Sequence, residues 1–234
     1  KEKAVGQTIV ITGANRGIGL AMVQAWCARG DTVLATCRQP SAALLESGAK
    51  VIDGVDVGSA DGVMNLQNAL DDRRVDMLYN NAGIMSSETV DGMNFDSIRD
   101  QFEVNTLGPL RVTMALLDNL HAGSKVGLMT SRMGSITDNT SGARYGYRAS
   151  KAAQNQFLRT FAVEHRRRAN NLIVRALHPG TVETGLSAPF RSNVPAGKLF
   201  SADFAAQCLL TKIDNASEQD SGRFFAWDGA PIPW

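Results

Sequence analysis

The chain alternates between short runs of apolar residues and longer segments in which apolar residues recur with helical spacing. QTIVIT and TVLATC are typical of buried strands, whereas GLAMVQAWCARG has helical spacing and ends at Gly30, a residue suited to a helix C-cap. The predicted strands are 7–12, 32–37, 50–57, 75–83, 125–131, 172–180 and 222–227. The predicted helices are 19–30, 41–48, 60–70, 97–120, 147–168 and 201–213.

This alternation of strands and helices predicts an α/β fold. Parallel strands need long crossover connections, and helices in those connections cover both faces of the sheet. We therefore expect a doubly wound, mainly parallel sheet of about seven strands. The chain has 234 residues and shows no internal repeat, low-complexity segment or linker, so residues 1–234 are predicted to form a single domain.

Composition and charge narrow the class of protein. Hydrophobic residues make up 44% of the chain and charged residues 20%, which is typical of a globular domain with a sizeable core. The net charge of +1 reflects no basic excess, so we expect neither a nucleic-acid partner nor an anionic membrane surface. The basic run at 166–168 is interpreted as a solvated helix end.

Cysteine and histidine positions argue against a disulfide framework or a metal site. Cys27, Cys37 and Cys208 are widely spaced and odd in number, which predicts free thiols in a reducing compartment. No histidine pair has metal-ligand spacing, and His178 is interpreted as a hydrogen-bonded structural residue. No apolar run has the length of a membrane helix, and the first residues lack a signal-peptide apolar region. We expect a cytoplasmic protein.

A glycine-rich loop, TGANRGIG (12–19), joins the first predicted strand to the first helix. Gly13, Gly17 and Gly19 would allow positive φ and close approach of the backbone to a pyrophosphate, which the N–H groups of the helix N-terminus would bind. A plain strand–helix turn is the alternative, but such a turn needs fewer glycines. The spacing G-x3-G-x-G also differs from the dinucleotide fingerprint G-x-G-x-x-G.

The end of the second predicted strand favours NADP(H) over NAD(H). NAD sites usually place an acidic residue there for the ribose 2′-hydroxyl, whereas this chain has Thr36, Cys37 and Arg38. The guanidinium of Arg38 can form a forked contact with a 2′-phosphate, and Arg16 in the glycine loop could contact the same phosphate. The alternative for each arginine is a solvated surface charge.

The segment YGYRASK contains a candidate catalytic pair. On a helix, Tyr147 and Lys151 lie on one face, four residues apart, whereas Tyr145 lies six residues before Lys151 and points elsewhere. A nearby ammonium group lowers the pKa of a phenol, which favours acid–base catalysis. Ser131, at the carboxyl end of the fifth strand, could polarise a substrate carbonyl. A chance pair of surface neighbours is the alternative.

Six motifs in this order resemble the short-chain dehydrogenase/reductase family: TGANRGIG, NNAG (80–83), the Asn of VNTLG (Asn105), TSRMG, YRASK and HPGTVET (178–184). Together they cover nearly the whole chain. The glycine loop and the ending GRFFAWDGAPIPW are most similar to the compact carbonyl-reductase and C-factor-like branch. The resemblance implies a Rossmann fold, hydride transfer between NADP(H) and a small carbonyl or alcohol substrate, and assembly as a homodimer or homotetramer.

The resemblance also implies roles for individual residues. Tyr147 would be the general acid in reduction and the base in oxidation, while Lys151 would lower its pKa and bind the nicotinamide ribose. Ser131 would hold the substrate oxygen, and Asn105 would support a proton-relaying water. The other residues expected at the cofactor are Asn15, Ile18, Asp56, Val57, Asn81, Ala82, Gly83, Pro179, Gly180, Val182 and Thr184.

The spacing between Ser131 and Tyr147, sixteen residues, is longer than is common in the family. The extra residues fall in the polar segment 135–146, a kind of loop that varies in length on a protein surface. Ser131 remains the candidate because it lies three residues before Gly134, as in the family pattern. Ser135 is interpreted as a loop hydroxyl.

The substrate is expected to meet a partly apolar pocket under a short lid. The segment 185–200 contains two prolines and two glycines with little periodicity, which predicts a mobile lid over the nicotinamide. Met133 and Phe190 would contribute apolar wall, and Tyr145 is expected in a loop or at the pocket wall. The identity of the carbonyl compound stays open.

Two other functions stay open beside a carbonyl reductase. One is dehydration or epimerisation on the same fold. The other is a signalling or regulatory protein that binds NADP(H), which the C-factor-like resemblance suggests. The pairing of Tyr147 with Lys151 favours an enzyme, because a protein that only binds the cofactor has no need of it.

Overall fold

Seven parallel strands form one sheet in the computed structural model, which describes residues 6–167, 171–189, 194–195 and 197–234. The order across the sheet is β3-β2-β1-β4-β5-β6-β9, and every neighbouring pair is parallel, as predicted. The strands are β1 (Thr8–Ile11), β2 (Thr32–Thr36), β3 (Lys50–Ile52), β4 (Val75–Asn80), β5 (Leu120–Met129), β6 (Ile173–His178) and β9 (Arg223–Ala226).

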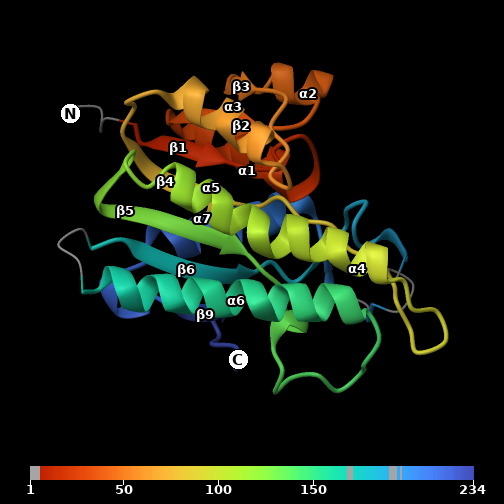
Figure 1. Ribbon diagram of the computed structural model, residues 1–234. Helices are drawn as coiled ribbons and strands as arrows, with labels where there is room; N and C mark the ends of the chain where they lie inside the picture. The colour runs from red at the N-terminus through yellow and green to blue at the C-terminus, as the bar shows by residue number, and fades with distance from the viewer. Residues whose placement is uncertain (1–5, 168–170, 190–193, 196) are drawn as a thin grey trace.

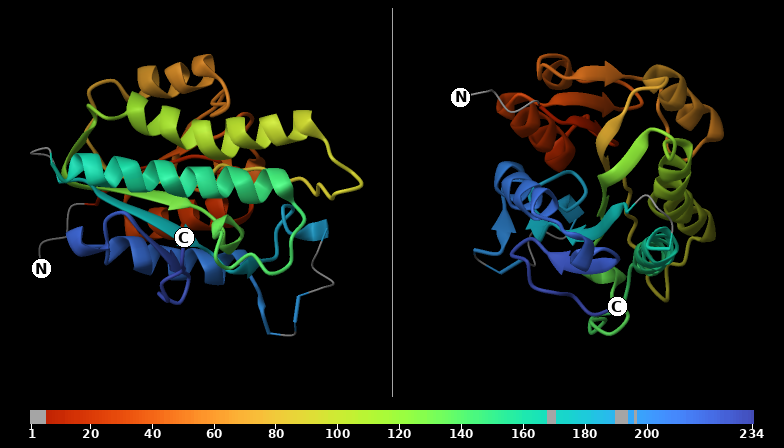
Figure 2. Two further views of the ribbon diagram at one scale, coloured as in Figure 1. Left: turned by 60° about the horizontal axis from the view of Figure 1, so that its bottom comes forward. Right: turned by 90° about the vertical axis from the view of Figure 1, so that its left-hand side faces the viewer.

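Helices cover both faces of this sheet, which confirms the predicted doubly wound architecture. α3, α5 and α6 lie on one face, and α1 and α7 lie on the other (Figure 1, Figure 2). The helices are α1 (Gly17–Arg29), α2 (Ala42–Leu45), α3 (Ala60–Leu70), α4 (Phe95–Phe102), α5 (Gly108–Ala115), α6 (Tyr145–His165) and α7 (Ala202–Asp214).

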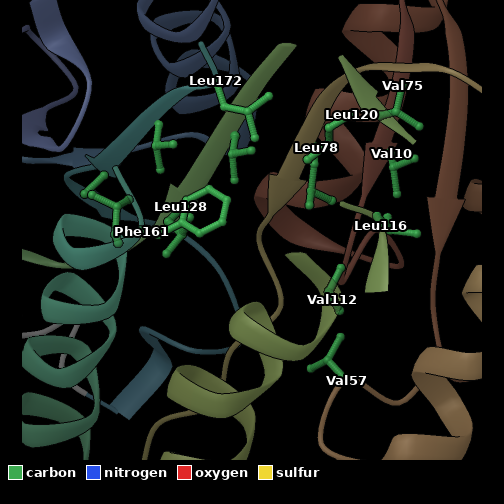
Figure 3. Close-up of a cluster of buried hydrophobic side chains, with 14 of the residues drawn as sticks. Val10, Val57, Val75, Leu78, Val112, Leu116, Leu120, Leu128, Phe161 and Leu172 are labelled. Atoms are coloured by element: carbon green, nitrogen blue, oxygen red, sulfur yellow. The ribbon is translucent and has the colours of Figure 1, made fainter. Parts of the chain in front are cut away.

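The strands bury both of their faces, so successive side chains enter two different cores. In β1, Ile9 and Ile11 pack under α1 and α7, whereas Val10 packs under α3 and α5. Both cores are almost fully closed to solvent. Figure 3 shows the second core, in which Val10, Val57, Val75, Leu78, Val112, Leu116, Leu120, Leu128, Phe161 and Leu172 are labelled.

The long helix predicted over 97–120 is wrong, because the structure divides this segment. α4 leads into a π-helical turn, Glu103–Leu107, and α5 then begins at Gly108 with Pro109 in its first turn. Pro109 lacks a backbone donor and suits the start of a helix better than its middle. The chain leaves α5 at Leu116, and Leu120 already belongs to β5.

The helix predicted over 147–168 also starts earlier than expected. α6 begins at Tyr145, so this tyrosine occupies the first helical turn and not a loop. Several predicted strands were too long at their carboxyl ends, because 53–57, 81–83 and 179–180 follow β3, β4 and β6 as irregular segments. These segments are the loops that follow the strands, where an open α/β sheet binds ligands.

Candidate active site

The glycine loop after β1 lies tightly against the segment that follows β4. Gly13 has φ 65° and Gly17 has φ 56°, in the left-handed region that favours glycine. A Cβ atom on Gly13 would lie 2.7 Å from the Cα of Ala82, and one on Gly19 would lie 2.5 Å from Nδ2 of Asn81. The sequence therefore needs glycine at both contacts.

Asn81 ties the two segments together. Its Nδ2 donates to the carbonyl oxygens of Thr12 at 3.0 Å and Gly13 at 2.8 Å. The Thr12 hydroxyl accepts from the backbone N–H groups of Asn81 and Ala82. The first turn of α1 opens beside this loop, and its N-cap residue, Arg16, makes no side-chain cap. A bare backbone with free helix N–H groups fits a pyrophosphate.

Two arginines lie where a 2′-phosphate was predicted. Arg38 lies two residues after β2, Arg16 precedes α1, and both residues are exposed. Within the described ranges, neither guanidinium takes part in an ion pair. Both charges are therefore available to an anion.

Three other residues predicted at the cofactor have side chains that contact neighbouring parts of the protein. Oδ1 of Asn15 accepts from the N–H of Ser41 at 2.5 Å, which links the glycine loop to the start of α2. Oδ1 of Asp56 accepts from the N–H of Gly58 at 2.9 Å. The side chain of Val57 is buried in the core of Figure 3, so only its backbone faces the loop region.

An open cleft brings Ser131 and Tyr147 together with several residues predicted at the nicotinamide, whereas Lys151 and Asn105 do not line it. Its empty volume, open solvent included, is about 1020 Å³. Ser131 comes from the end of β5, Tyr147 from the first turn of α6, and Ile18 from α1. The other lining residues are Met85, Thr130, Arg132, Met133, Asp138, Thr140, Ser141, Arg148, His178, Pro179, Gly180, Thr181, Val182, Thr184, Leu186 and Ser187.

Tyr147 and Lys151 are both buried, and burial controls their acid–base properties. It raises the pKa of Tyr147 to about 12, while a hydrogen bond with the Ser131 hydroxyl acts in the opposite direction. Burial lowers the pKa of Lys151 to about 7. The only influence that lowers the tyrosine pKa is this bond with Ser131, so the lowering by Lys151 that was expected is not found in the protein alone.

The ammonium group of Lys151 is held beneath the tyrosine ring. Nζ donates to the carbonyl oxygen of Met129 at 2.8 Å and to Oε1 of Gln154 at 3.0 Å. It lies 5.9 Å from the centre of the Tyr147 ring. The pair is therefore close, one helical turn apart, as the spacing predicts.

Asn105 reaches the same region from the π-helical turn. Its Oδ1 accepts from the N–H of Ile84 and its Nδ2 donates to the Ile84 carbonyl, each at 2.8 Å. Nδ2 also donates to the Ser150 hydroxyl at 3.0 Å. A Cβ on Gly83 would lie 3.2 Å from Oδ1 of Asn105 and 3.6 Å from Nζ of Lys151, so these polar atoms converge around Gly83.

The π-helical turn is a feature that the sequence analysis missed. Such turns are rare and often occur at functional sites, because the extra residue redirects one side chain. The pair Gly108–Pro109 was the available signal, since it marks the break between the turn and α5.

A buried carboxylate, Glu88, fixes the start of α6 and was also missed. Its Oε2 accepts from the N–H of Gly146 at 3.2 Å, and its Oε1 accepts from Nε2 of Gln101 at 2.6 Å. Its carbonyl oxygen accepts from the N–H of Arg144 at 2.7 Å. A carboxylate at a helix N-terminus satisfies free N–H groups and favours the helix dipole.

Residues 132–144, here called the cleft loop, form much of the outer wall of the cleft. The N–H and Oγ1 of Thr137 donate to the carbonyl oxygen of Trp234 at 3.1 and 2.8 Å. Oγ of Ser135 accepts from the N–H of Asp138 at 3.1 Å, which gives this hydroxyl a role within the loop. The segment interpreted as a variable surface loop therefore borders the site.

His178 departs from the interpretation as a hydrogen-bonded structural residue. It lines the cleft, and within the described residues its buried Nδ1 has no hydrogen-bond partner. Burial, followed by the positive charge of Arg132, lowers its pKa to about 4. A neutral imidazole thus faces the site at neutral pH.

The structure describes only part of the predicted lid, residues 185–200. Leu186 and Ser187 line the cleft, whereas Phe190 lies outside the described residues. Two short strands, β7 (Thr181–Val182) and β8 (Leu199–Phe200), pair in parallel at the base of this segment. These strands are only two residues long, so no apolar pattern in the sequence predicts their pairing.

Across the described residues, histidine, cysteine and carboxylate side chains form no group of three that could hold a metal ion. Each helix described is too short or too polar to span a bilayer. Cys27, Cys37 and Cys208 are free thiols.

The sheet order, the glycine loop and the cleft at the carboxyl ends of the strands define a Rossmann fold. The sequence model described as short chain dehydrogenase matches residues 7–195. The chain belongs to this family of oxidoreductases.

Two curated relatives and one solved structure show similarity over most of their length. The chain is 38% identical to 1-hydroxy-2-glutathionyl-2-methyl-3-butene dehydrogenase of Rhodococcus sp. (strain AD45), over 97% of this chain and 99% of the relative. It is 37% identical to C-signal of Myxococcus xanthus, over 68% of this chain and 93% of the relative. NADPH-bound carbonyl reductase from chicken fatty liver superposes with a TM-score of 0.86 at 27% identity, covering 99% and 100% of the two chains.

Proposed function

We propose that this protein is an NADP(H)-dependent carbonyl reductase, and that Tyr147 is its acid–base catalyst. The observation that carries the proposal is the cleft, in which Ser131 and Tyr147 lie together with the residues expected at the nicotinamide. The NADPH-bound carbonyl reductase with the similar fold supports the same reaction class.

NADP(H), when bound, supplies or accepts the hydride. In reduction, the carbonyl carbon gains that hydride and its oxygen gains the phenolic proton of Tyr147. Ser131 donates a hydrogen bond to the same oxygen, which polarises the carbonyl group. Lys151, when protonated, stabilises the phenolate that remains and returns a proton to it, and Asn105 would support the water through which solvent reprotonates Lys151.

The cofactor specificity rests on Arg38 and Arg16. Both are exposed cations without a carboxylate partner among the described residues, and a 2′-phosphate would supply one. Gly13, Gly17 and the first turn of α1 would bind the pyrophosphate.

Consumption of NADPH and of NADH, measured side by side with a panel of aldehydes, ketones and diketones, tests this function. We expect turnover with NADPH and weaker turnover with NADH. A preference for NADH would contradict the role of Arg38 and leave the catalytic assignment standing. Tight NADPH binding without turnover of any panel member would contradict the reductase.

Two relatives suggest further candidates. The Rhodococcus relative is named for a glutathionyl-substituted alcohol, so oxidation of such an alcohol belongs in the same assay. C-signal suggests a signalling function that depends on binding of the cofactor, and the Tyr147–Lys151 geometry favours catalysis over it. Dehydration or epimerisation on this fold has no comparable observation in its favour.

We also propose a homodimer or homotetramer in the cytoplasm. An apolar depression between α5 and α6, lined by Leu110, Phe157 and Phe161 among others, supports contact between copies at these helices. Three free thiols support a reducing compartment. Sedimentation velocity would measure the oligomeric state.

A further inference from the structure

The outer wall of the cleft carries more charge than a purely apolar substrate requires. Arg132 and Asp138 come from the cleft loop, and Arg148 comes from α6, one residue after Tyr147. All three residues line the same cleft as Ser131 and Tyr147. A substrate that reaches Tyr147 therefore enters a cleft bordered by two arginines and one aspartate.

The charges on this wall do not balance. Nη1 of Arg132 lies 3.0 Å from Oδ2 of Asp138, so these two form an ion pair. Arg148 makes hydrogen bonds only to neutral groups in the part of the chain that is described, and it has no ion-pair partner there. The three lining residues leave one net positive charge.

Arg148 is held in place and still has a donor to spare. Its Nε donates to the carbonyl oxygens of Gly142 and Ala143, each at 3.0 Å. Its Nη2 donates to the Ser141 hydroxyl at 2.8 Å. Nη1 makes no hydrogen bond to any described residue. The fixed guanidinium offers this donor at little further cost in side-chain entropy.

The surroundings of Arg148 favour an anion. Burial and the neighbouring charge of Arg144 lower the pKa of Arg148, and Asp138 only partly offsets this. An anionic ligand would offset the repulsion between Arg148 and Arg144. It would also give the partly desolvated guanidinium of Arg148 a charge-assisted hydrogen bond. A neutral ligand would do neither.

We propose that the cleft takes carbonyl or alcohol substrates that carry a carboxylate group, and that Arg148 binds this carboxylate. The inference rests on the proposed reductase function and adds the substrate class. Arg132 contributes a second, partly neutralised charge, and Asp138 limits the attraction.

Matched pairs of oxo acids and their methyl esters test this inference. The probes are 4-formylbenzoate, phenylglyoxylate and 4-oxopentanoate, each compared with its methyl ester in NADPH consumption. We expect the wild-type protein to show a higher kcat/KM for the acid in at least one pair. The preference should weaken as ionic strength rises, because salt screens the attraction.

Three variants separate charge recognition from loop structure. Arg148→Gln should lower the acid-to-ester ratio of kcat/KM by about tenfold, mainly through KM, as loss of one charge-assisted hydrogen bond predicts. Asp138→Asn should change the ratio in the opposite direction, because it removes the competing carboxylate. Arg74→Gln is the control, since Arg74 is exposed just before β4, at the amino end of the sheet.

The possible failures are distinguishable. Turnover of the esters without any preference for the acids, or a ratio that Arg148→Gln and Asp138→Asn both leave unchanged, would overturn the inference alone. Turnover of other carbonyl compounds but of none of these six would also overturn the inference alone, whereas tight NADPH binding without turnover of any carbonyl compound would contradict the proposed reductase and the inference with it.

Discussion

The two walls of the cleft are built differently. On the cofactor side, the backbone of the glycine loop packs against the side-chain amide of Asn81 and the backbone of Ala82, with no room for a side chain at Gly13 or Gly19. On the substrate side, the cleft loop lines the site with side chains and is held at Thr137 by a segment almost one hundred residues away in the chain.

The difference separates what is general in this fold from what is particular to this protein. A wall made of backbone contacts tolerates few substitutions and suits one ligand, the dinucleotide. A wall made of loop side chains can change without altering the sheet. Substitutions on the cofactor side should therefore affect folding and cofactor binding together, and those on the substrate side should affect selectivity.

The largest effect is expected at Gly13. Alanine there would place Cβ 2.7 Å from the Cα of Ala82 at φ 65°. The left-handed backbone and the overlap together should lower the free energy of unfolding by about 3 kcal/mol. Urea denaturation measures this, with Gly48→Ala as control, because Gly48 has φ 83° and open space around it. Equal losses in both variants would contradict the tight contact.

The second largest effect is expected at Glu88, which fixes the start of α6. Glu88→Gln replaces an acceptor by an amide that cannot satisfy both Gly146 N–H and the Gln101 amide. We expect a loss of about 2 kcal/mol in urea denaturation. The exposed Glu46→Gln should stay within about 0.5 kcal/mol. A small loss at Glu88 would mean that α6 does not need this carboxylate.

Arg38 tests the cofactor side without disturbing its backbone. Arg38→Gln should raise the Kd for NADPH about tenfold and leave the Kd for NADH nearly unchanged, because only NADPH carries the 2′-phosphate. Fluorescence titration measures both constants. Lys50→Gln, an exposed change at the amino end of β3, is the charge-matched control. Equal weakening of both cofactors in Arg38→Gln would exclude a phosphate contact.

His178 should give the smallest effect, and its sign follows from the lowered pKa. The folded protein holds this histidine neutral down to pH about 4, whereas the unfolded chain takes up a proton near its ordinary value of 6.5. The contribution of neutral His178 to the free energy of unfolding is therefore fully present above pH 6.5, and it is lost as the pH falls toward 4. Partial exposure limits the loss to about 1 kcal/mol.

The comparison of wild type with His178→Gln isolates this contribution. The difference in unfolding free energy between the two proteins should change between pH 6.5 and 4 and stay constant above pH 7. A difference that is independent of pH would show that His178 titrates normally and is open to solvent.

Local pattern was enough to predict the sheet and the glycine loop. Buried strands such as β1 and β4 alternate between two cores, and their apolar runs are visible in the sequence. Tyr147 and Lys151 were placed on one helical face by their spacing alone. The strands and the helical pair depend on residues close together in the sequence, and the loop depends on glycines that allow its backbone conformation.

The missed features depend on contacts distant in sequence. The π-helical turn at Asn105 forms where the side chain meets Ile84 and Ser150, although Gly108–Pro109 could have shown that the helix breaks. The cleft loop faces the site because Thr137 binds Trp234. The charged wall at Arg132 and Arg148 follows from that placement, which no local pattern contains.

The role of Tyr147, at the junction of the two walls, is tested most directly by a matched pair of tyrosine variants. Tyr147→Phe removes one buried hydroxyl, and Tyr145→Phe removes a hydroxyl two residues earlier on an exposed side chain. The rate of NADPH oxidation with a reducible carbonyl compound should fall at least about 100-fold in Tyr147→Phe, with NADPH binding retained, since a positioned general acid contributes that much or more. Tyr145→Phe should keep the wild-type rate. Equal rates in the two variants would contradict Tyr147 as the acid and the proposed reductase mechanism.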